Sequence, residues 1–363
     1  MGDVLFLGLG RVGLRSLRLF RELVRDAYIY AVDRDPDVGR LLNGLDGVEF
    51  HAYGPEVLGD LVKKAKLAVT ALPSSVAFNV ISELVKRGVS VVDVSFFAED
   101  PYVLEEHVAR YKSVFVPDAG FAPGYSNLVV GRVVKELGAI EAVEILVGEV
   151  PLGSAPPLDH AVTWNPSDLI EEYTRPARVV EDYEVRYVDP LESVMEVELE
   201  GLGKFEGFLS DGLRTLIKNV KAKHMREVTI RRPGHLSKMR LLRDLGLMSK
   251  EAVRVGDVSV KPAELLAKLL EARMPKDLEC LAVLNVRVSS PRREVSELAV
   301  LRGGPENPAI PTFTALVQAC TAKLVYEGEV EGGIRPLETL AEFKEEYENY
   351  LRSKGVNITL KTT

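Results

Sequence analysis

Short apolar runs alternate with longer amphipathic stretches through the first third of the chain. Apolar runs of strand length occupy residues 4–7, 28–32, 67–71, 89–94 and 114–116. Residues 12–24 and 75–87 instead repeat apolar side chains at helical spacing. This alternation is typical of a parallel sheet with crossover helices. We therefore expect residues 1–123 to form an α/β domain, a doubly wound parallel sheet of the Rossmann type.

The pattern changes after residue 123. Helices are expected at residues 125–137, 236–245 and 262–271. Strand-like segments, most of which alternate apolar with polar positions, lie at residues 142–147, 184–188, 194–200, 204–209, 228–231, 281–288 and 294–301. Such alternation indicates a sheet with one solvated face. We expect residues 124–302 to form an α+β substrate and oligomerisation domain with a mixed sheet. Helices within residues 303–363, at 312–326 and 337–351, are expected to complete the first domain.

Composition and charge narrow the class of protein. The sequence has 363 residues and a formal net charge of −8, which argues against a nucleic-acid partner. No apolar run reaches the ~18 residues needed to cross a bilayer, so no membrane partner is expected. Cys280 and Cys320 belong to no disulfide or metal-binding pattern, which favours a reducing cytoplasm and no metal. Gln318 is the only glutamine while 28% of residues are charged, a bias typical of proteins from hot organisms.

A glycine motif supplies the strongest chemical signal. Residues 8–13 read GLGRVG, directly after an apolar strand and at the start of a helix. Gly8 permits the tight turn, Gly10 allows a pyrophosphate to approach the backbone, and Gly13 allows the helix to pack closely on the strand. The amides of Arg11 and Val12, at the helix N-terminus, would face the phosphates. The motif predicts a dinucleotide cofactor.

An acidic residue follows at the end of the second strand. Asp33 would accept hydrogen bonds from the adenosine ribose hydroxyls, which favours NAD over NADP. Arg34 could instead pair with the 2′-phosphate of NADP, so NADP stays possible. The ends of the next two strands should line the nicotinamide half of the cleft with Ala71, Leu72, Pro73 and Ser95. Asp93 has either a catalytic role or a local hydrogen-bonding role.

Six further motifs resemble one enzyme family. They read VVDVSFFAEDP, VPDAGFAPGYSN, TWNPSDLIEEYTRPAR, FLSDGLRTL, RRPGH and GGIRPLE, in this order along nearly the whole sequence. Together they resemble the saccharopine dehydrogenase family, and within it most closely the lysine 6-dehydrogenases. The resemblance implies a homo-oligomeric enzyme, a dimer being favoured, that oxidises the C–N bond at the end of the L-lysine side chain with NAD and releases ammonia.

Two alternatives stay open at this point. The protein could be a saccharopine- or carboxynorspermidine-type enzyme that joins or splits an amine and an aldehyde. That reaction needs a second cation for a second carboxylate, and Arg178, Arg231 and Arg232 could each supply it. The protein could also bind NAD without catalytic activity.

Within the family motifs, the substrate carboxylate needs a cationic partner. Arg214 is the first candidate because its planar guanidinium suits bidentate pairing, and Arg175 is the second. Tyr173, Trp164 and Phe96 could line the aliphatic part of a small amino-acid or amine substrate. Each of these residues has an alternative role in an ion pair or in ordinary packing.

Two residues are candidates for proton transfer. His235 opens a predicted helix and its imidazole ordinarily titrates near neutrality; packing or capping is its alternative role. Asp118 follows the last strand of the cofactor domain and could hold a proton or the substrate amine, or it could support the adjacent glycine-containing loop.

Overall fold

The computed structural model describes residues 2–163, 165–275 and 278–363. The protein forms two compact units. The first comprises Met1–Leu128 and Pro311–Leu351, and the second comprises Val129–Ile310 and Arg352–Thr363. Among the described residues, no helix is both long and apolar enough to cross a membrane.

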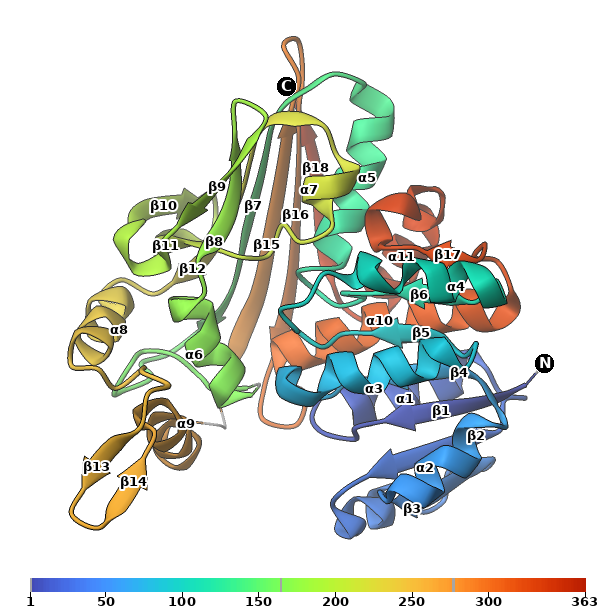
Figure 1. Ribbon diagram of the computed structural model, residues 1–363. Coiled ribbons are helices and arrows are strands. Elements are labelled where there is room, and N and C mark those ends of the chain that lie inside the picture. Colours follow the sequence, from blue (N-terminus) through green and yellow to red (C-terminus); the bar gives the residue numbers. More distant parts are fainter. Residues whose placement is uncertain (1, 164, 276–277) are drawn as a thin grey trace. The chain divides into compact units, whose positions relative to one another are not determined.

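The first unit contains a seven-stranded sheet in which every neighbouring pair is parallel (Figure 1). Its order is β17-β6-β5-β4-β1-β2-β3. The strands are β1 (Asp3–Leu7), β2 (Ile29–Asp33), β3 (Val48–Ala52), β4 (Ala65–Thr70), β5 (Ser90–Asp93), β6 (Val114–Val116) and β17 (Gly333–Ile334). The order reverses between β1 and β4, and ligands of such sheets bind where the strand order reverses, beyond the carboxyl ends of the strands. The predicted Rossmann-type sheet is confirmed.

Helices cover this sheet because their apolar sides pack on strands that are buried on both faces. They are α1 (Gly13–Leu23), α2 (Pro55–Val62), α3 (Ser74–Lys86), α4 (Glu105–Tyr111), and the parts of α10 (Ala309–Glu327) and α11 (Lys344–Ser353) that belong to the unit. Ile81 and Val108 from two of these helices join strand residues such as Leu5 and Phe115 in one core cluster. Gln318 of α10 donates a hydrogen bond from Nε2 to the Thr70 carbonyl at 2.8 Å.

The second unit contains a nine-stranded mixed sheet. The main path is β10-β11-β12-β7-β15-β16-β18, and β8 and β9 pair beside β12. The strands are β7 (Ile140–Pro151), β8 (Ala177–Glu181), β9 (Glu184–Val188), β10 (Met195–Leu199), β11 (Gly203–Ser210), β12 (Ala222–Arg231), β15 (Cys280–Ser289), β16 (Glu294–Gly303) and β18 (Asn357–Thr362). The pairing of β12 with β7 is parallel and the other pairings are antiparallel. This is the mixed sheet that the sequence predicts.

Five helices and a separate hairpin accompany this sheet. The helices are α5 (Tyr125–Leu137), which begins in the first unit, α6 (Pro166–Thr174), α7 (Leu216–Asn219), α8 (His235–Asp244) and α9 (Pro262–Arg273). The hairpin of β13 (Val253–Val255) and β14 (Val258–Val260) forms a two-stranded sheet of its own. Asn165 caps α6 by accepting the Ser167 amide at 2.8 Å, and Pro166 starts the helix, as expected for these residue types.

Two differences from the sequence-based expectation concern the C-terminal segment. Helix α11 begins only at Lys344, after two short 3-10 turns at Leu337–Thr339 and Ala341–Phe343. The assignment of all of residues 303–363 to the first domain as helices is wrong at its end, because β18 pairs with β16 in the second unit. The alternating segment 357–362 of β18 was overlooked because it is an edge strand that is largely exposed.

Candidate functional site

The glycine loop between β1 and α1 has the geometry of a dinucleotide-binding turn. Gly8 has a φ of +85°, and a Cβ there would lie 2.4 Å from the Ala71 carbonyl oxygen. A Cβ on Gly13 would lie only 1.8 Å from the Gly8 carbonyl oxygen. These two glycines are therefore required by the fold itself, one by the turn and the other by the close approach of helix and strand.

Gly10 is different because the fold does not require it. A Cβ at this position would meet no described atom within 4 Å. Helix α1 follows this loop. Its N-cap residue, Val12, makes no side-chain capping hydrogen bond, and its first turn contains no acidic residue. Arg11 and Arg15 are one helical turn apart. Burial lowers the pKa of Arg15, and the nearby positive charge of Arg11 lowers it further. A pyrophosphate fits this position, which offers open space, a helix N-terminus and two cations. Arg15 was not among the cofactor-binding residues predicted from the sequence.

Asp33 has a structural contact that its position in the sequence does not reveal. Its Oδ2 accepts a hydrogen bond from the Leu9 amide at 2.6 Å, and its Oδ1 accepts one from the Asp35 amide at 2.9 Å. The carboxylate thus fixes the glycine loop as well as lying at the end of β2. Arg34 is exposed and makes no ion pair or hydrogen bond with any described residue.

A buried polar network links the ends of β4 and β5. Asp93 accepts hydrogen bonds from the Thr70 hydroxyl (2.5 Å), the Ser95 hydroxyl (2.7 Å) and the Ser95 amide (2.8 Å). The Leu72 amide donates to the Ser95 hydroxyl oxygen at 3.1 Å. Complete burial, with a smaller contribution from the negative charge of Asp118, raises the pKa of Asp93 to about 7. Ala71 and Pro73 flank Leu72 in the same loop, next to Gly8.

Asp118 lies near this network, because the amide of the next residue, Ala119, donates a hydrogen bond to the Asp93 carbonyl oxygen at 2.7 Å. The residue is 4% exposed and its backbone φ is +53°, a conformation that Asp tolerates better than most residues. Asp93, at the end of β5, and Asp118, after β6, therefore lie on neighbouring segments. A carboxyl group that titrates near neutrality is matched to proton transfer at neutral pH.

Stability should depend on pH through Asp93. In the folded protein its pKa is about 7, against about 3.9 in an unfolded chain, so the folded state holds the extra proton between these values. Raising the pH from 5 to 8 should therefore lower the free energy of unfolding of the wild type, relative to Asp93→Asn, by roughly 3 kcal/mol. Urea titrations of both proteins at several pH values measure this difference. Asp60→Asn, at an exposed position, is the control, and an equal pH response of wild type and Asp93→Asn would contradict the assignment.

In the second unit, a tyrosine joins α6 to α8 and β12. The Tyr173 hydroxyl lies 2.7 Å from His235 Nε2 and accepts a hydrogen bond from Arg231 Nε at 2.9 Å. Arg231 also donates to Glu172 Oε2 at 2.6 Å. The Tyr173 ring stacks on Phe208 with centroids 4.9 Å apart. All of these contacts are inside the second unit.

The contacts of His235 fix its protonation. Its Nδ1 lies 2.7 Å from the Leu158 carbonyl oxygen, which can only accept, so Nδ1 carries the proton and Nε2 accepts from Tyr173. Burial and then the charge of Arg231 lower the pKa of His235 to about 3. The prediction that His235 titrates near neutrality is therefore wrong, although it does open α8. His160 lies against His235 with ring centroids 5.3 Å apart, and burial lowers its pKa as well.

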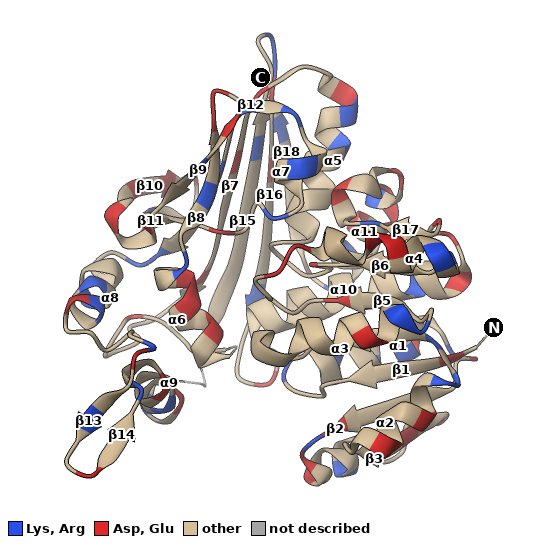
Figure 2. Cartoon of the chain, viewed as in Figure 1, with Lys and Arg blue, Asp and Glu red and all other residues tan. Residues whose placement is uncertain are grey.

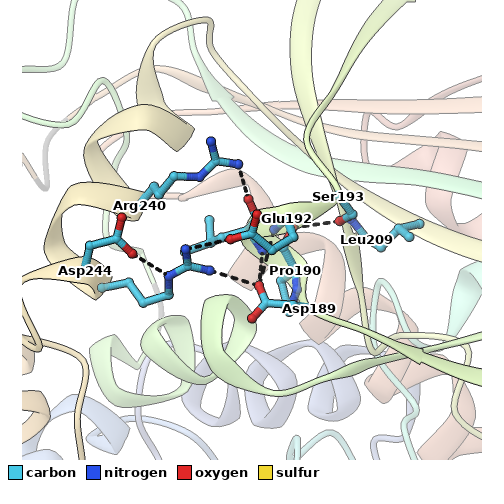
Figure 3. A network of polar contacts seen from close by, with 9 residues as sticks. Asp189, Pro190, Glu192, Ser193, Leu209, Arg240 and Asp244 are labelled. Atoms are coloured by element: carbon cyan, nitrogen blue, oxygen red, sulfur yellow. Dashed lines mark hydrogen bonds and ion pairs between the residues drawn. The ribbon is translucent and has the colours of Figure 1, made fainter.

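An ion-pair network fixes the helix that carries His235. Arg243 of α8 pairs with Asp189 (3.1 Å), Glu192 (2.8 Å) and Asp244 (3.0 Å). Arg240 donates to the Leu191 carbonyl, so two arginines of α8 are bound to the 3-10 turn at Pro190–Glu192 (Figure 3). The first two carboxylates are more than half exposed, and such pairs are worth little individually. Their role is to orient α8.

Removing the Tyr173 hydroxyl should weaken the fold. Tyr173→Phe leaves His235 Nε2 without its donor and Arg231 Nε without its acceptor, both in buried surroundings. We expect the free energy of unfolding to fall by about 1–3 kcal/mol. Tyr187→Phe is the matched control because that tyrosine is 70% exposed. Urea unfolding that gave equal stability for Tyr173→Phe and wild type would show that the hydroxyl is not engaged as described.

Arginines also gather after α6 and β11. Burial, and then the positive charge of Arg214, lower the pKa of Arg175. Arg214 is 6% exposed and Arg175 is partly buried, and the segments that carry them are joined by Arg178 and Asp211. Asp211 is bound by Arg178 in a bidentate pair, at 2.6 and 3.0 Å. The structure therefore brings together the two arginines predicted to hold a substrate carboxylate.

A series of hydroxyls links two carboxylates in the same unit. The Thr229 hydroxyl lies 3.2 Å from Glu172 Oε1 and 2.8 Å from the Ser210 hydroxyl, which donates to Glu227 Oε1 at 2.9 Å. The Glu227 carboxylate packs against Gly212, where a Cβ would clash with it at 1.8 Å. The sequence analysis missed these residues. Their signal was the alternation of Glu227, Thr229 and Arg231 along β12, which places three polar side chains on one face of a buried strand.

Two further residues were predicted to line the substrate. Phe96 is half-buried and follows β5 in the first unit. Trp164 lies outside the described residues. Within the described parts of the protein, no group of three or more His, Cys, Asp or Glu side chains could hold a metal ion.

Comparison with known proteins identifies the family. The model of the saccharopine dehydrogenase C-terminal domain matches residues 120–356, which is more than half of the sequence. The chain belongs to the saccharopine dehydrogenase family. A saccharopine dehydrogenase (L-Glu forming) from Saccharomyces cerevisiae has the same fold, with a TM-score of 0.79 and 15% sequence identity over 100% of both proteins. A DAP dehydrogenase from C. glutamicum gives a TM-score of 0.47 and 11% identity, covering 97% of this protein and 98% of its own length. The protein thus has the oxidoreductase fold of the saccharopine dehydrogenases.

Proposed function

We propose that this saccharopine dehydrogenase family member is an NAD(H)-dependent enzyme that oxidises the C–N bond at the end of the L-lysine side chain and releases ammonia. The observation that carries the proposal is that Arg214, which is 6% exposed, and the partly buried Arg175 lie on two segments joined by the Arg178–Asp211 ion pair. Planar guanidinium groups bind a carboxylate in a bidentate manner, and the α-carboxylate distinguishes lysine from a simple diamine.

The other arginines favour lysine over a substrate with further carboxylates. Arg178 is occupied by Asp211, and Arg231 is bound to Glu172 and Tyr173. Arg232 donates to the carbonyl oxygens of Pro151 and Gly153, at 3.1 and 2.6 Å. Each arginine that could bind a second carboxylate already has a protein partner. Binding a second carboxylate at any of these three arginines would therefore replace one of these interactions.

The cofactor assigned to the first unit is NAD(H). The open side of Gly10 and the arginines of α1 accommodate the pyrophosphate, and the negative charge of Asp33 disfavours a 2′-phosphate. When bound, the nicotinamide supplies the acceptor for the electron pair that leaves the substrate carbon. The protein's own residues hold the loop for it: Asp33 through the Leu9 amide, and Ser95 through the Leu72 amide.

The reaction also needs proton acceptors. The lysine ε-amine must be neutral to support loss of the electron pair from its carbon, and its ordinary pKa is about 10.4. We assign the removal of that proton to Asp118, with Asp93 as a positioning residue that accepts a backbone hydrogen bond from Ala119, the neighbour of Asp118. Lysine, NAD+ and water then give the aldehyde, NADH, ammonium and one further proton. The water supplies the aldehyde oxygen after the C=N bond has formed.

A substrate panel tests the proposal. We expect NADH formation from NAD+ with L-lysine, a much higher KM with cadaverine, which lacks the carboxylate, and no NADH with saccharopine. Turnover of saccharopine in preference to lysine would replace this proposal with the splitting of a C–N bond between two amino-acid units. Tight NAD+ binding without turnover on any amine would instead indicate a protein that binds the cofactor without catalysis.

We further propose that the protein is a homodimer whose partner covers the β13–β14 hairpin. The cross-strand pairs Val253↔Val260 and Val255↔Val258 put four valines on one face, and three of them are 52%, 64% and 62% exposed. An isolated two-stranded hairpin is marginally stable in water, and a continuous exposed apolar face indicates a partner surface. Residues 250–271 carry equal numbers of basic and acidic side chains, so two copies of this segment can approach without the repulsion that the net charge of −8 would otherwise cause.

Sedimentation equilibrium of the full-length protein tests the dimer. The wild type should sediment as a dimer, and Val255→Asp with Val258→Asp should sediment as a folded monomer. Val185→Asp, at a 42% exposed valine on β9, is the matched control and should remain dimeric. A monomeric wild type, or a double variant that stays dimeric, would contradict this assignment.

A further inference from the structure

A cavity of about 560 Å³ lies in the first unit, away from the glycine loop. It is lined by the starts of β4 and β5, by the residue before β6, and by the ends of α2, α3 and α4. The glycine loop follows the carboxyl end of β1, and Ala71 and Ser95 follow the carboxyl ends of β4 and β5. Because these strands are parallel, the cavity is at the opposite edge of the sheet from the residues assigned to the cofactor.

The charged residues that line the cavity are all cations. They are Lys63, Lys66, Arg87 and Lys112, and no acidic residue is among the lining residues. Lys63 pairs with Asp60 at 2.7 Å, and Arg87 lies 3.9 Å from Glu83. The side chains of Lys66 and Lys112 make no ion pair or hydrogen bond with any residue that the structure describes. In a protein with a net charge of −8, this is a local concentration of positive charge.

Helix ends account for only part of this charge. Lys63, Arg87 and Lys112 are the C-caps of α2, α3 and α4, and basic side chains are favourable at helix C-termini; Figure 2 shows basic residues at the ends of α3 and α4. Lys66 lies on β4 and is explained by no helix end. Together with the three C-cap residues, Lys66 gives the cavity four cationic side chains, which would attract an anionic ligand.

Two uncharged residues give the cavity further chemistry. Ser113 is 5% exposed, and its hydroxyl makes no hydrogen bond with any described residue. A buried hydroxyl without a partner is costly, and a ligand oxygen would satisfy it. Tyr111 is 47% exposed, and its ring lies against Gly88, where a Cβ would come within 3.0 Å of the ring. The exposed Arg110 guanidinium lies over this ring, 5.7 Å from its centre, and a flat ligand ring would stack there in place of that mobile side chain.

We propose that this cavity binds a small anion that carries a phosphate group and a flat ring, in the class of nucleoside monophosphates. The phosphate would lie between Lys66 and Lys112, with Ser113 donating a hydrogen bond, and the ring would stack on Tyr111. The volume is within the range of ordinary small-molecule sites, about 300–1,000 Å³. The site is separate from the one assigned to NAD(H) and does not depend on the proposed reaction.

Calorimetric titration of the full-length protein with AMP tests the site. We expect Lys66→Ala with Lys112→Ala to weaken one AMP binding event by more than about tenfold, because charge-assisted hydrogen bonds are lost. That event should persist in Lys86→Ala, a neighbouring lysine outside the cavity, and in Gly10→Ala, which alters only the cofactor loop. Inorganic phosphate should compete with AMP for it, and adenosine should not bind.

Both lysines are exposed, so the double variant should unfold at the wild-type temperature and retain its dehydrogenase activity. Unchanged AMP binding in the double variant would overturn the proposal. So would loss of all AMP binding in Gly10→Ala, since AMP would then bind only at the cofactor loop. Failure of inorganic phosphate to compete at millimolar concentration would also overturn it.

Discussion

Gly10→Ala should weaken NAD(H) binding by about ten- to a hundredfold while leaving the fold intact. The added methyl group meets no described atom within 4 Å, and Gly10 is not among the residues with positive φ. Folding should therefore be unaffected or slightly favoured. The same methyl group would occupy the space into which a pyrophosphate approaches, and forcing it against a ligand costs about 1–3 kcal/mol. Calorimetry with NADH and thermal unfolding measure the two effects.

Two other glycines serve as controls. Gly59→Ala, in α2, also adds a methyl group to open space; it should raise the free energy of unfolding by roughly 0.5–1 kcal/mol and leave the affinity for NADH unchanged. Gly13→Ala should fail to fold normally, because its Cβ would lie 1.8 Å from a carbonyl oxygen. Unchanged NADH affinity in Gly10→Ala would mean that the glycine loop does not hold the pyrophosphate.

Arg214→Ala should raise the KM for L-lysine by about a hundredfold. Truncating one partner of a buried charged pair costs about 2–5 kcal/mol, and Arg214 is 6% exposed beside Arg175. The activity with cadaverine should be unaffected, because that substrate has no carboxylate to lose. Initial rates with both amines, over a range of concentrations, separate carboxylate recognition from a general loss of structure.

Arg214→Lys supports the interpretation if the alanine variant proves unstable. It keeps the charge but loses the planar fork, so its KM for lysine should lie between those of wild type and Arg214→Ala. Arg226→Ala, at an arginine that is about half exposed and paired with Glu144, is the control. Equal losses with lysine and cadaverine in Arg214→Ala would contradict carboxylate binding.

The first half of the candidate site could be predicted because its signals are local. The spacing of Gly8, Gly10 and Gly13 reports a turn between one strand and the next helix, and Asp33 follows at the end of the neighbouring strand. These features can be recognised from residues that are close in the sequence, provided that the strands form a regular parallel sheet. The sequence did not show that Asp33 binds the Leu9 amide, because that contact depends on how closely the two loops approach.

The second half was predicted less completely because its contacts are between distant segments. Tyr173 and His235 are 62 residues apart, and Tyr173 and Arg231 are 58 residues apart. Nothing local reports that a histidine at the start of a helix will be buried against an arginine, and it is this burial that keeps His235 neutral. The parallel pairing of β12 with β7 is equally non-local.

Short strands were overlooked for a different reason. The strands β3, β8 and β13 have at most five residues each. The residues of β13 are exposed and those of β3 are partly buried or exposed, so neither strand has one fully buried face. Hydrophobic periodicity is weak where neither face of a strand is fully covered. In such segments the pairing partner, rather than the local pattern, determines the strand.

The most direct test of the account is the stoichiometry of the reaction with L-lysine. Purified protein would be incubated with L-lysine and NAD+ at about 70–80 °C, a range suggested by the compositional bias towards charged residues, and the incubation would be repeated at 37 °C. NADH would be followed by absorbance and ammonia assayed in the same samples. The account predicts that NADH and ammonia appear in equal amounts at one or both temperatures. NADH without ammonia, or no NADH at either temperature while NADPH is consumed with an aldehyde and an amino acid, would contradict it.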